Sequence, residues 1–265
     1  MNWGTQFALR WAAVGAVTWA AYRGRALGRS GVWAALVVGG VVFSAGGWAW
    51  AGLLLLFFVS SSLLSHAFAP RKRVLSEKFS KGSRRDWGQV MANGALAALL
   101  AASHAWAPES RWVWVAFGGA LAAVNADTWA TEIGVLSPHL PRHILTGRRV
   151  PQGTSGGVSP LGMAAALGGA ALIGAATWVG APTAKAVLAV TVGGWAGAVL
   201  DSLLGATVQA MYFCPQCEKE TEHTPLHTCG APTRYLRGWE WMDNDTVNFL
   251  ASLAGAALAA ALWVL

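Results

Sequence analysis

Acidic side chains stand in stretches of the sequence that are otherwise apolar. Asp127 and Glu132 lie in VNADTWATEIG, directly after the apolar run RWVWVAFGGALAA, and Asp201 lies within GAVLDSLLGA. A carboxylate at membrane depth is costly, so it usually faces a protein interior or a wet cavity and marks a candidate functional site. Two alternatives are open. Asp127 and Glu132 stand at the water interface, or Asp201 forms a hydrogen bond between helices.

Helix geometry limits how the first two carboxylates act together. Asp127 and Glu132 are five residues apart, which is about 140° around an ideal helix. They serve one site only if the end of their helix is broken or lies between other helices. Carboxylates with nearby Asn and Thr oxygens are hard ligands that suit Mg²⁺, which is usually held by one or two carboxylates together with substrate phosphates.

A glycine-rich stretch, GTSGG at residues 153–157, offers a place for such a phosphate. Its glycines allow backbone N–H groups to turn toward an anion, and Thr154 and Ser155 add hydroxyls. Ser159 and Pro160 are typical of an N-cap and a first helical residue, which would point the positive end of a helix dipole at the same place. The alternative is an ordinary loop before a helix. It is not a Walker loop, because no Lys-Ser or Lys-Thr follows.

A basic segment, EKFSKGSRRDW, interleaves Lys and Arg with Gly, Asp and Trp. That pattern fits a folded segment, in which Arg grips phosphate oxygens with its guanidinium fork and Lys serves as a point charge. The alternative is a solvated face that sets the topology and attracts anionic lipid. Asn93 follows inside the next apolar run, and DNDTVN at residues 243–248 opens the last one.

All three cysteines fall in one short stretch, CPQCEKETEHTPLHTC. Cys214 and Cys217 have the C-x2-C spacing, and His227 and Cys229 complete a Cys3His set that predicts a closed, structural zinc site. His223 competes with His227 for the fourth position. The alternative is a disulfide plus one free thiol, which a reduced cytoplasmic loop disfavours.

The elements that must position these residues are membrane-spanning helices. Of 265 residues, 55% are hydrophobic and only 12% are charged, which is outside the range of ordinary soluble domains. The sequence predicts an all-α, polytopic bundle that forms a single transmembrane domain over residues 1–265, with a zinc-binding cytoplasmic loop inserted at 211–240. Glycines such as Gly119, Gly193 and Gly194 suit close helix packing in lipid. Apolar runs of spanning length occur at eight places, roughly 5–22, 31–46, 47–65, 87–106, 112–134, 160–180, 184–210 and 246–264.

The distribution of basic residues predicts the orientation, because Lys and Arg concentrate on the cytoplasmic side of membrane proteins. Sixteen of them fall in one set of alternate loops and two in the opposite set, with Arg10 inside the first span. We therefore expect a multi-pass protein of the cytoplasmic membrane, with both termini outside and the polar stretches at the cytoplasmic face. The net charge of +7 follows mostly from this rule, so no nucleic-acid partner is expected.

Five ordered stretches together resemble those of one family of membrane proteins. They are KGSRRDWGQVMANG, NADTWATEIG, GTSGGVSPLG, LDSLLGA and DNDTVN, and the similarity runs from about residue 60 to the C-terminus. The family was long classed as a domain of unknown function and includes the plant phytyl-phosphate kinase, with bacterial and archaeal relatives. The resemblance implies phosphorylation of an isoprenyl monophosphate to the diphosphate by a nucleoside triphosphate, CTP in the plant case. The cysteine loop is not shared by some relatives, which suggests a local accessory.

The resemblance and the residue chemistry together imply roles for the polar side chains. The tail of the acceptor would lie among the helices in the membrane lipid, while its head reaches the cytoplasmic face, where positioning, Mg²⁺ and cationic groups supply the catalysis. The catalytic candidates are Asp127, Glu132, Asp201, Lys81 and Arg84, with the three acids as Mg²⁺ ligands. The nucleotide- and phosphate-binding candidates are Lys78, Arg85, Asn93, Gly153, Thr154, Ser155, Gly156, Gly157, Asp243, Asp245 and Asn248, and the zinc ligands are Cys214, Cys217, His227 and Cys229.

Two other functions stay open at this point. An ion-coupled transporter also places acids such as Asp127 and Asp201 in discontinuous helices near glycines, although here the polar stretches cluster at one face. A cytidylyltransferase or a lipid-alcohol kinase also brings CTP and a lipid together at acidic helices. The first would release pyrophosphate, and the second would accept an unphosphorylated prenol.

Overall fold

The computed structural model describes residues 3–68 and 84–265, and helices make up most of them. The apolar runs of the sequence become these helices, and their ends fall close to the predicted bounds. The helices are α1 (Trp3–Arg23), α2 (Arg29–Gly46), α3 (Trp48–Ala67), α5 (Trp87–His104), α6 (Arg111–Gly134), α7 (Pro160–Ala176) with the 3-10 turn η2 (Thr177–Val179), α8 (Ala184–Thr207) and α9 (Asn244–Val264).

Five of these helices are long and apolar enough to cross a membrane, namely α2, α3, α7 with η2, α8 and α9. The predicted multi-pass helical bundle is thus confirmed, whereas the count of eight crossings stays a prediction. The prediction of an all-α fold is wrong in part, because short strands form in two of the loops. Within each loop, pairing between its own strands satisfies some of the backbone N–H and C=O groups.

Local signals in the sequence explain where several helices begin. The hydroxyl of Ser159 accepts a hydrogen bond from Gly162 N at 3.0 Å, and Pro160 occupies the first turn of α7. This confirms the predicted N-cap and first helical residue. Asp86 caps α5 by accepting a hydrogen bond from Gln89 N, and the Asp86 backbone N–H donates to Gln89 Oε1, which completes a capping box.

Helix α6 is the centre of the bundle. Every residue from Val113 to Ala126 is buried, and α3, α5, α7, α8 and α9 pack around the helix. A helix that is apolar on all sides is stable only inside such a ring of neighbours. Asp127 is the next residue after this buried run. It therefore lies where the buried part of α6 ends, toward the loops that carry the strands.

Glycines let α9 approach α6 and α8 closely. A Cβ atom on Gly119 would lie 2.5 Å from Gly255 O, and one on Gly193 would lie 2.7 Å from the same oxygen. A Cβ atom on Gly194 would lie 2.4 Å from Ala122 Cβ. The predicted role of these glycines in close helix packing is therefore confirmed.

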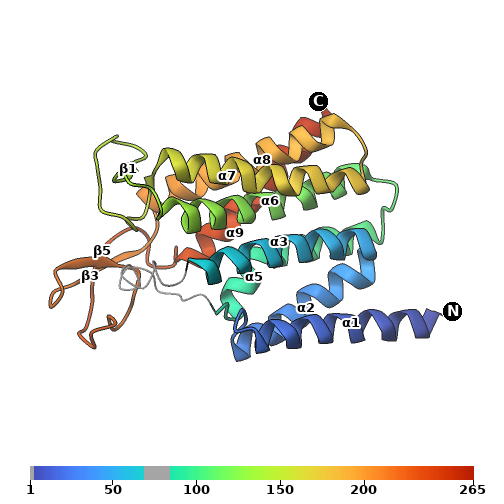
Figure 1. The fold of residues 1–265 in the computed structure, drawn as a ribbon, viewed down its shortest axis with the longest axis horizontal. Helices are drawn as coiled ribbons and strands as arrows, with labels where there is room; N and C mark the ends of the chain where they lie inside the picture. The colour runs from blue at the N-terminus through green and yellow to red at the C-terminus, as the bar shows by residue number, and fades with distance from the viewer. Residues whose placement is uncertain (1–2, 69–83) are drawn as a thin grey trace.

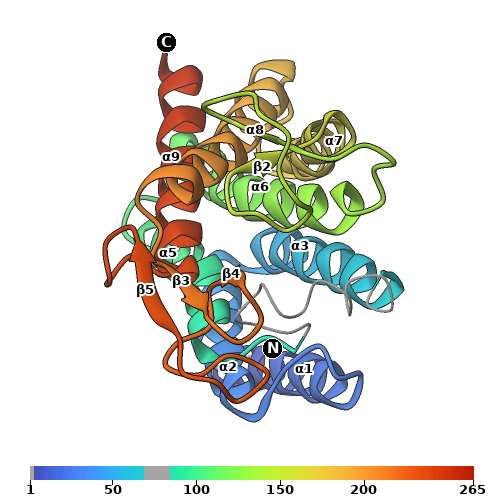
Figure 2. The same ribbon diagram turned by 90° about the vertical axis from the view of Figure 1, so that its left-hand side faces the viewer.

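The strands and the two termini lie at opposite ends of the bundle (Figure 1). Strands β1 (Arg142–His143) and β2 (Gly157–Val158) form an antiparallel pair between α6 and α7. Strands β3 (Met211–Cys214), β4 (Lys219–Thr221) and β5 (Arg234–Arg237) form an antiparallel sheet in the order β4-β3-β5. Figure 2 looks at the molecule from this loop end, with the three-stranded sheet in front of the helices.

The three-stranded sheet is fixed to the C-terminal end of α8. The Arg237 guanidinium donates to Gly205 O at 3.3 Å and to Ala206 O at 3.4 Å, and Trp239 N donates to Val208 O at 2.8 Å. A cation at this position satisfies carbonyl groups that have no partner in the helix and complements its dipole. The sheet thus stands beside the turn of α8 that follows Asp201.

Candidate active site

A cavity of about 630 Å³ lies at the loop end of the bundle. Its walls come from the C-terminal parts of α6 and α8, the segment 152–159, and the beginnings of α7 and α9, together with residues of α3, α5 and the cysteine loop. The cavity brings together most of the residues that the sequence singled out. Those that line it are Arg85, Asn93, Asp127, Glu132, Gly153, Thr154, Ser155, Gly156, Gly157, Asp201 and Asn248.

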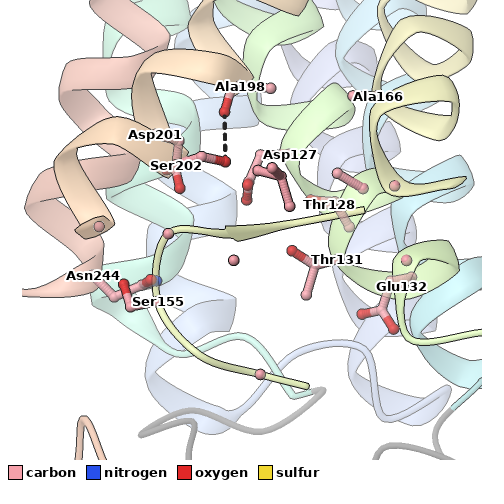
Figure 3. Close-up of a pocket in the computed structure, with 18 of the residues that line it drawn as sticks. Asp127, Thr128, Thr131, Glu132, Ser155, Ala166, Ala198, Asp201, Ser202 and Asn244 are labelled. Atoms are coloured by element: carbon pink, nitrogen blue, oxygen red, sulfur yellow. Dashed lines mark hydrogen bonds between the residues drawn. The ribbon is translucent and has the colours of Figure 1, made fainter. Parts of the chain in front are cut away.

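Asp127 and Asp201 lie on adjacent walls of this cavity, on α6 and α8 (Figure 3). Asp201 Oδ2 is buried and has no hydrogen-bond partner among the residues that the structure describes. The carboxylates of Asp127 and Glu222 lie near enough to repel that of Asp201. Buried like charges of this kind are costly by themselves and are stabilised by a cation between them.

Glu132 has different surroundings on the same helix. Its side chain is only 4% exposed, and Oε1 accepts a hydrogen bond from Ser65 Oγ of α3 at 2.7 Å. Arg85 lies nearby, with its guanidinium carbon 5.3 Å and 5.2 Å from the ring centroids of Phe57 and Phe58. Burial lowers the pKa of Arg85 to about 10, while the Glu132 carboxylate acts in the opposite direction. The guanidinium therefore keeps its charge at neutral pH.

The path of α6 shows how Asp127 and Glu132 reach the same cavity. The helix is continuous to Gly134, so its end is not broken. Of the two conditions set by the helix geometry, the second is met, because the end of α6 lies between other helices. The two acids face different walls, and Figure 3 shows Glu132 beyond Thr131, on the side away from Asp201.

The stretch 153–157 forms a further wall, held against α8. Gly156 has φ of +77°, and a Cβ atom there would lie 2.4 Å from Ala206 Cβ. Only glycine combines that backbone conformation with so close an approach. Ser155 Oγ donates to Gln209 Oε1 at 2.8 Å, just beyond the end of α8. The loop is thus fixed next to the two aspartates.

The remaining candidates lie elsewhere. Asp243 is exposed and caps α9, because its carboxylate accepts hydrogen bonds from Thr246 N at 2.9 Å and Thr246 Oγ1 at 2.8 Å. The structure thus gives Asp243 a capping role, and its contact with a phosphate stays a prediction. Arg84 is exposed and lies over an aromatic ring of α1, and neither it nor Asp245 lines the cavity. Lys78 and Lys81 lie outside the described residues.

Other residues that the sequence analysis did not single out for this site also line the cavity, among them Gln209, Glu222 and His223. Gln209 Nε2 donates to Glu222 Oε1 at 3.0 Å, while its carbonyl oxygen accepts from Ser155. This relay joins the glycine-rich loop, the end of α8 and the cysteine loop. The signal in the sequence was the polar run ETEH between the two halves of the Cys/His set.

The cysteine loop forms a compact cluster of possible metal ligands. The ligand atoms of Cys214, Cys217, His227 and Cys229 all lie within 4.8 Å of one another, which favours His227 over His223 as the fourth member. Cys214 Sγ and Cys229 Sγ are 3.6 Å apart, close to the spacing of about 3.8 Å that tetrahedral Zn–S bonds impose. All three cysteines are free, so the disulfide alternative is wrong. A hydrogen bond with Cys229 and burial raise the pKa of Cys217 to about 11, and a metal ion would displace that proton.

Comparisons with known proteins cover almost the whole chain. A family model described as integral membrane protein DUF92 matches residues 12–256. Protein PGR of Arabidopsis thaliana is 30% identical over 280 residues, which span 96% of this chain and 95% of that protein. An uncharacterized membrane protein of Methanocaldococcus jannaschii is 32% identical over 69% of this chain and 75% of its own length, and one of Synechocystis is 27% identical over 85% and 78%. No solved structure matches the chain.

Proposed function

The chain belongs to the DUF92 family of integral membrane proteins, and from that premise we propose that it phosphorylates a membrane-embedded isoprenyl monophosphate to the diphosphate. The donor is a nucleoside triphosphate. CTP as donor and a phytyl or geranylgeranyl chain on the acceptor are proposed on the resemblance to the plant phytyl-phosphate kinase. The distribution of Lys and Arg supports a site that faces the cytoplasm.

The observation that carries the proposal is the convergence of acidic, basic and glycine-rich segments on one cavity. Asp127, Asp201, Arg85 and the stretch 153–157 come from four separate parts of the chain and line the same space. Carboxylates suit a Mg²⁺-bound triphosphate, a guanidinium suits a phosphate, and glycine backbone allows close approach to phosphate oxygens. Phosphoryl transfer depends mainly on such positioning and electrostatic stabilisation.

The donor atoms on the aspartate side fit Mg²⁺. Asp201 Oδ2 is buried without a hydrogen-bond partner in the described part of the chain, so a cation would satisfy it. The amides of Asn244 and Asn248 line the same cavity and add hard oxygen atoms. We assign Asp127 and Asp201 as the Mg²⁺ ligands and Glu132 as the partner of Arg85. When bound, Mg²⁺ neutralises charge on the triphosphate.

The acceptor supplies its own nucleophile, because a monophosphate oxygen is already ionised and needs no strong base. A bond forms between that oxygen and the terminal phosphorus of the donor, the bond from this phosphorus to the bridging oxygen breaks, and the nucleoside diphosphate leaves. Arg85 neutralises phosphate charge. The backbone of 153–157 holds phosphate oxygens, and the relay from Ser155 through Gln209 to Glu222 keeps this loop in place.

For the Cys/His cluster we propose a structural zinc ion, because four protein ligands leave no open position for a substrate. The cluster stabilises the sheet that carries Glu222 and His223 to the cavity wall. The cysteine loop would thus hold part of the wall of the active site in place.

The decisive experiment incubates the purified protein in detergent with geranylgeranyl or phytyl monophosphate, Mg²⁺ and each of the four nucleoside triphosphates, and resolves the products by mass. We expect the isoprenyl diphosphate and a nucleoside diphosphate, both lost in Asp201→Asn. A CMP-lipid with pyrophosphate would identify a cytidylyltransferase, and turnover of a prenol alone would identify an alcohol kinase. If no nucleotide is consumed with any of these lipids, the kinase is refuted and transport in proteoliposomes becomes the next test.

A further inference from the structure

A second cavity, of about 240 Å³, lies among α1, α2, α3 and α5. Its walls are almost entirely hydrocarbon, from Ala, Val, Leu and Phe side chains. It extends from Leu27, just before α2, to Phe43 and Trp48, near the turn between α2 and α3. That distance is most of the length of α2, roughly 20 Å at the rise of an α-helix. We call this cavity the apolar groove.

The apolar groove meets the cavity of about 630 Å³ that holds Asp127 and Asp201, which we call the polar cavity. The two spaces share three residues of one short segment. Arg85, Gln89 and Asn93 line both spaces. The Arg85 guanidinium lies over the rings of Phe57 and Phe58, which also line the groove. A half-buried cation therefore lies where hydrocarbon walls give way to polar ones. Asn93 Oδ1 is buried there and has no hydrogen-bond partner among the described residues.

This junction has the chemistry of a site for one amphiphilic molecule with an anionic head and a long apolar chain. Arg85 pairs with a phosphate, and the walls of the groove exclude water from the chain. We propose that the apolar groove holds the isoprenoid tail of the acceptor, with its phosphate passing Arg85 into the polar cavity. This inference deepens the proposed function, since it places the substrate tail between α1, α2, α3 and α5.

The far end of the apolar groove would then limit the length of the tail. Gly52 of α3 lines the groove near Trp48, at the end away from Arg85. A Cβ atom on Gly52 would meet nothing within 4 Å, so we expect a larger side chain there to take up space at this end of the groove. Such a change should reject long tails and spare short ones, because only a long tail reaches that depth.

Gly15 of α1 offers a matched control. A Cβ atom there also meets nothing within 4 Å, and Gly15 does not line the groove. Replacing either helical glycine by leucine raises helix propensity in the same way. We expect Gly52→Leu to raise KM for a 20-carbon isoprenyl monophosphate at least about tenfold relative to a 10-carbon one, and Gly15→Leu to leave this ratio unchanged. Equal ratios in both variants would overturn the tail site.

A binding experiment without nucleotide tests the tail site independently of the proposed activity. A 20-carbon isoprenyl monophosphate with a photoreactive group at its tail end is cross-linked to the full-length protein without nucleotide, and the modified residues are mapped by mass spectrometry. Labelling near Gly52, competed by unlabelled 20-carbon monophosphate, supports the tail site even if no phosphoryl transfer occurs. Labelling elsewhere, or competition by phosphatidylglycerol alone, would mean that the groove holds a membrane lipid and would overturn the inference.

Discussion

At the scale of single residues, Asp127 and Asp201 place like charges in one cavity, at a cost to the folded protein. If Mg²⁺ and a triphosphate offset that cost, neutral variants should lose activity and gain stability. We predict that Asp127→Asn and Asp201→Asn each lower kcat at least about 100-fold and stabilise the ligand-free protein by about 1 kcal/mol. Turnover and thermal unfolding in detergent measure the two effects.

The control for this prediction is Glu109→Gln, the same change of carboxylate to amide at an exposed position between α5 and α6. It should alter neither turnover nor unfolding temperature. If an aspartate variant keeps wild-type turnover, the metal assignment is wrong. If it loses both turnover and stability, the aspartates hold the fold together and do not serve the ligand.

Single-residue chemistry was predictable from sequence where the signal is local. Ser159 and Pro160 predicted the beginning of a helix, and in the structure they are the N-cap and the first residue of α7. The environment of Glu132 was not predictable, because its partners Ser65 and Arg85 lie on segments far away in the chain. Residue type alone makes Glu132 resemble Asp127, and only tertiary contacts give the two side chains their different surroundings.

At the scale of elements, the glycine-rich loop depends on its contact with α8. In Gly156→Ala, an alanine would have to adopt a positive φ, which is strained for a residue with a Cβ atom. Its methyl group would also lie 2.4 Å from Ala206 Cβ. We predict a loss of activity of at least about tenfold, since small displacements of positioning groups are costly in phosphoryl transfer. Steady-state turnover at saturating Mg²⁺ measures it.

Gly147→Ala is the matched control, because Gly147 also has a positive φ, of +67°, but a Cβ atom there meets nothing within 4 Å. Both variants carry the same kind of backbone strain. Activity that falls equally in the two would show that strain in the loops matters and that the approach of Gly156 to α8 does not.

The Cys/His cluster allows a second prediction at this scale. We expect His227→Ala to abolish the proposed zinc binding, because His227 is a member of the cluster, and His223→Ala to retain it, because His223 lines the cavity at the loop end instead. Zinc content per chain, measured by atomic emission, gives the result. We expect zinc loss to lower turnover as well, since the sheet that positions Glu222 would loosen.

If chelation of zinc leaves turnover unchanged, the cysteine loop is an accessory that the reaction does not need. The resemblance to relatives without this loop suggests the same. The spacing of the cysteines and His227 in the sequence predicted the Cys/His cluster. It did not reveal that Glu222 returns to the cavity, because that depends on how β3, β4 and β5 dock on the end of α8 through Arg237. Such docking leaves no periodic trace in the sequence.

At the scale of the whole molecule, hydrophobic periodicity and length were enough to place the helices, since each apolar run became one helix. The arrangement of the helices was not predictable, because an apolar helix face can pack against many other apolar faces and does not specify which one. The central position of α6 is recognisable only afterwards, in the unbroken burial from Val113 to Ala126. The same limit hid the apolar groove, whose walls come from four helices.

The orientation of the bundle is the prediction on which the others depend, because a nucleoside triphosphate is available only on the cytoplasmic side. The two termini lie at one end of the bundle and the strands at the other (Figure 1). The polar cavity lies at the end with the strands, and the basic residues predict that this end is cytoplasmic. We therefore expect a membrane-impermeant maleimide to label Glu109→Cys in intact cells and Thr146→Cys only after permeabilisation. Both positions are exposed, and the unsubstituted protein serves as the blank for its own thiols. The reverse pattern would put the cavity outside the cell, away from any triphosphate, and would exclude the kinase whatever the geometry of its acids.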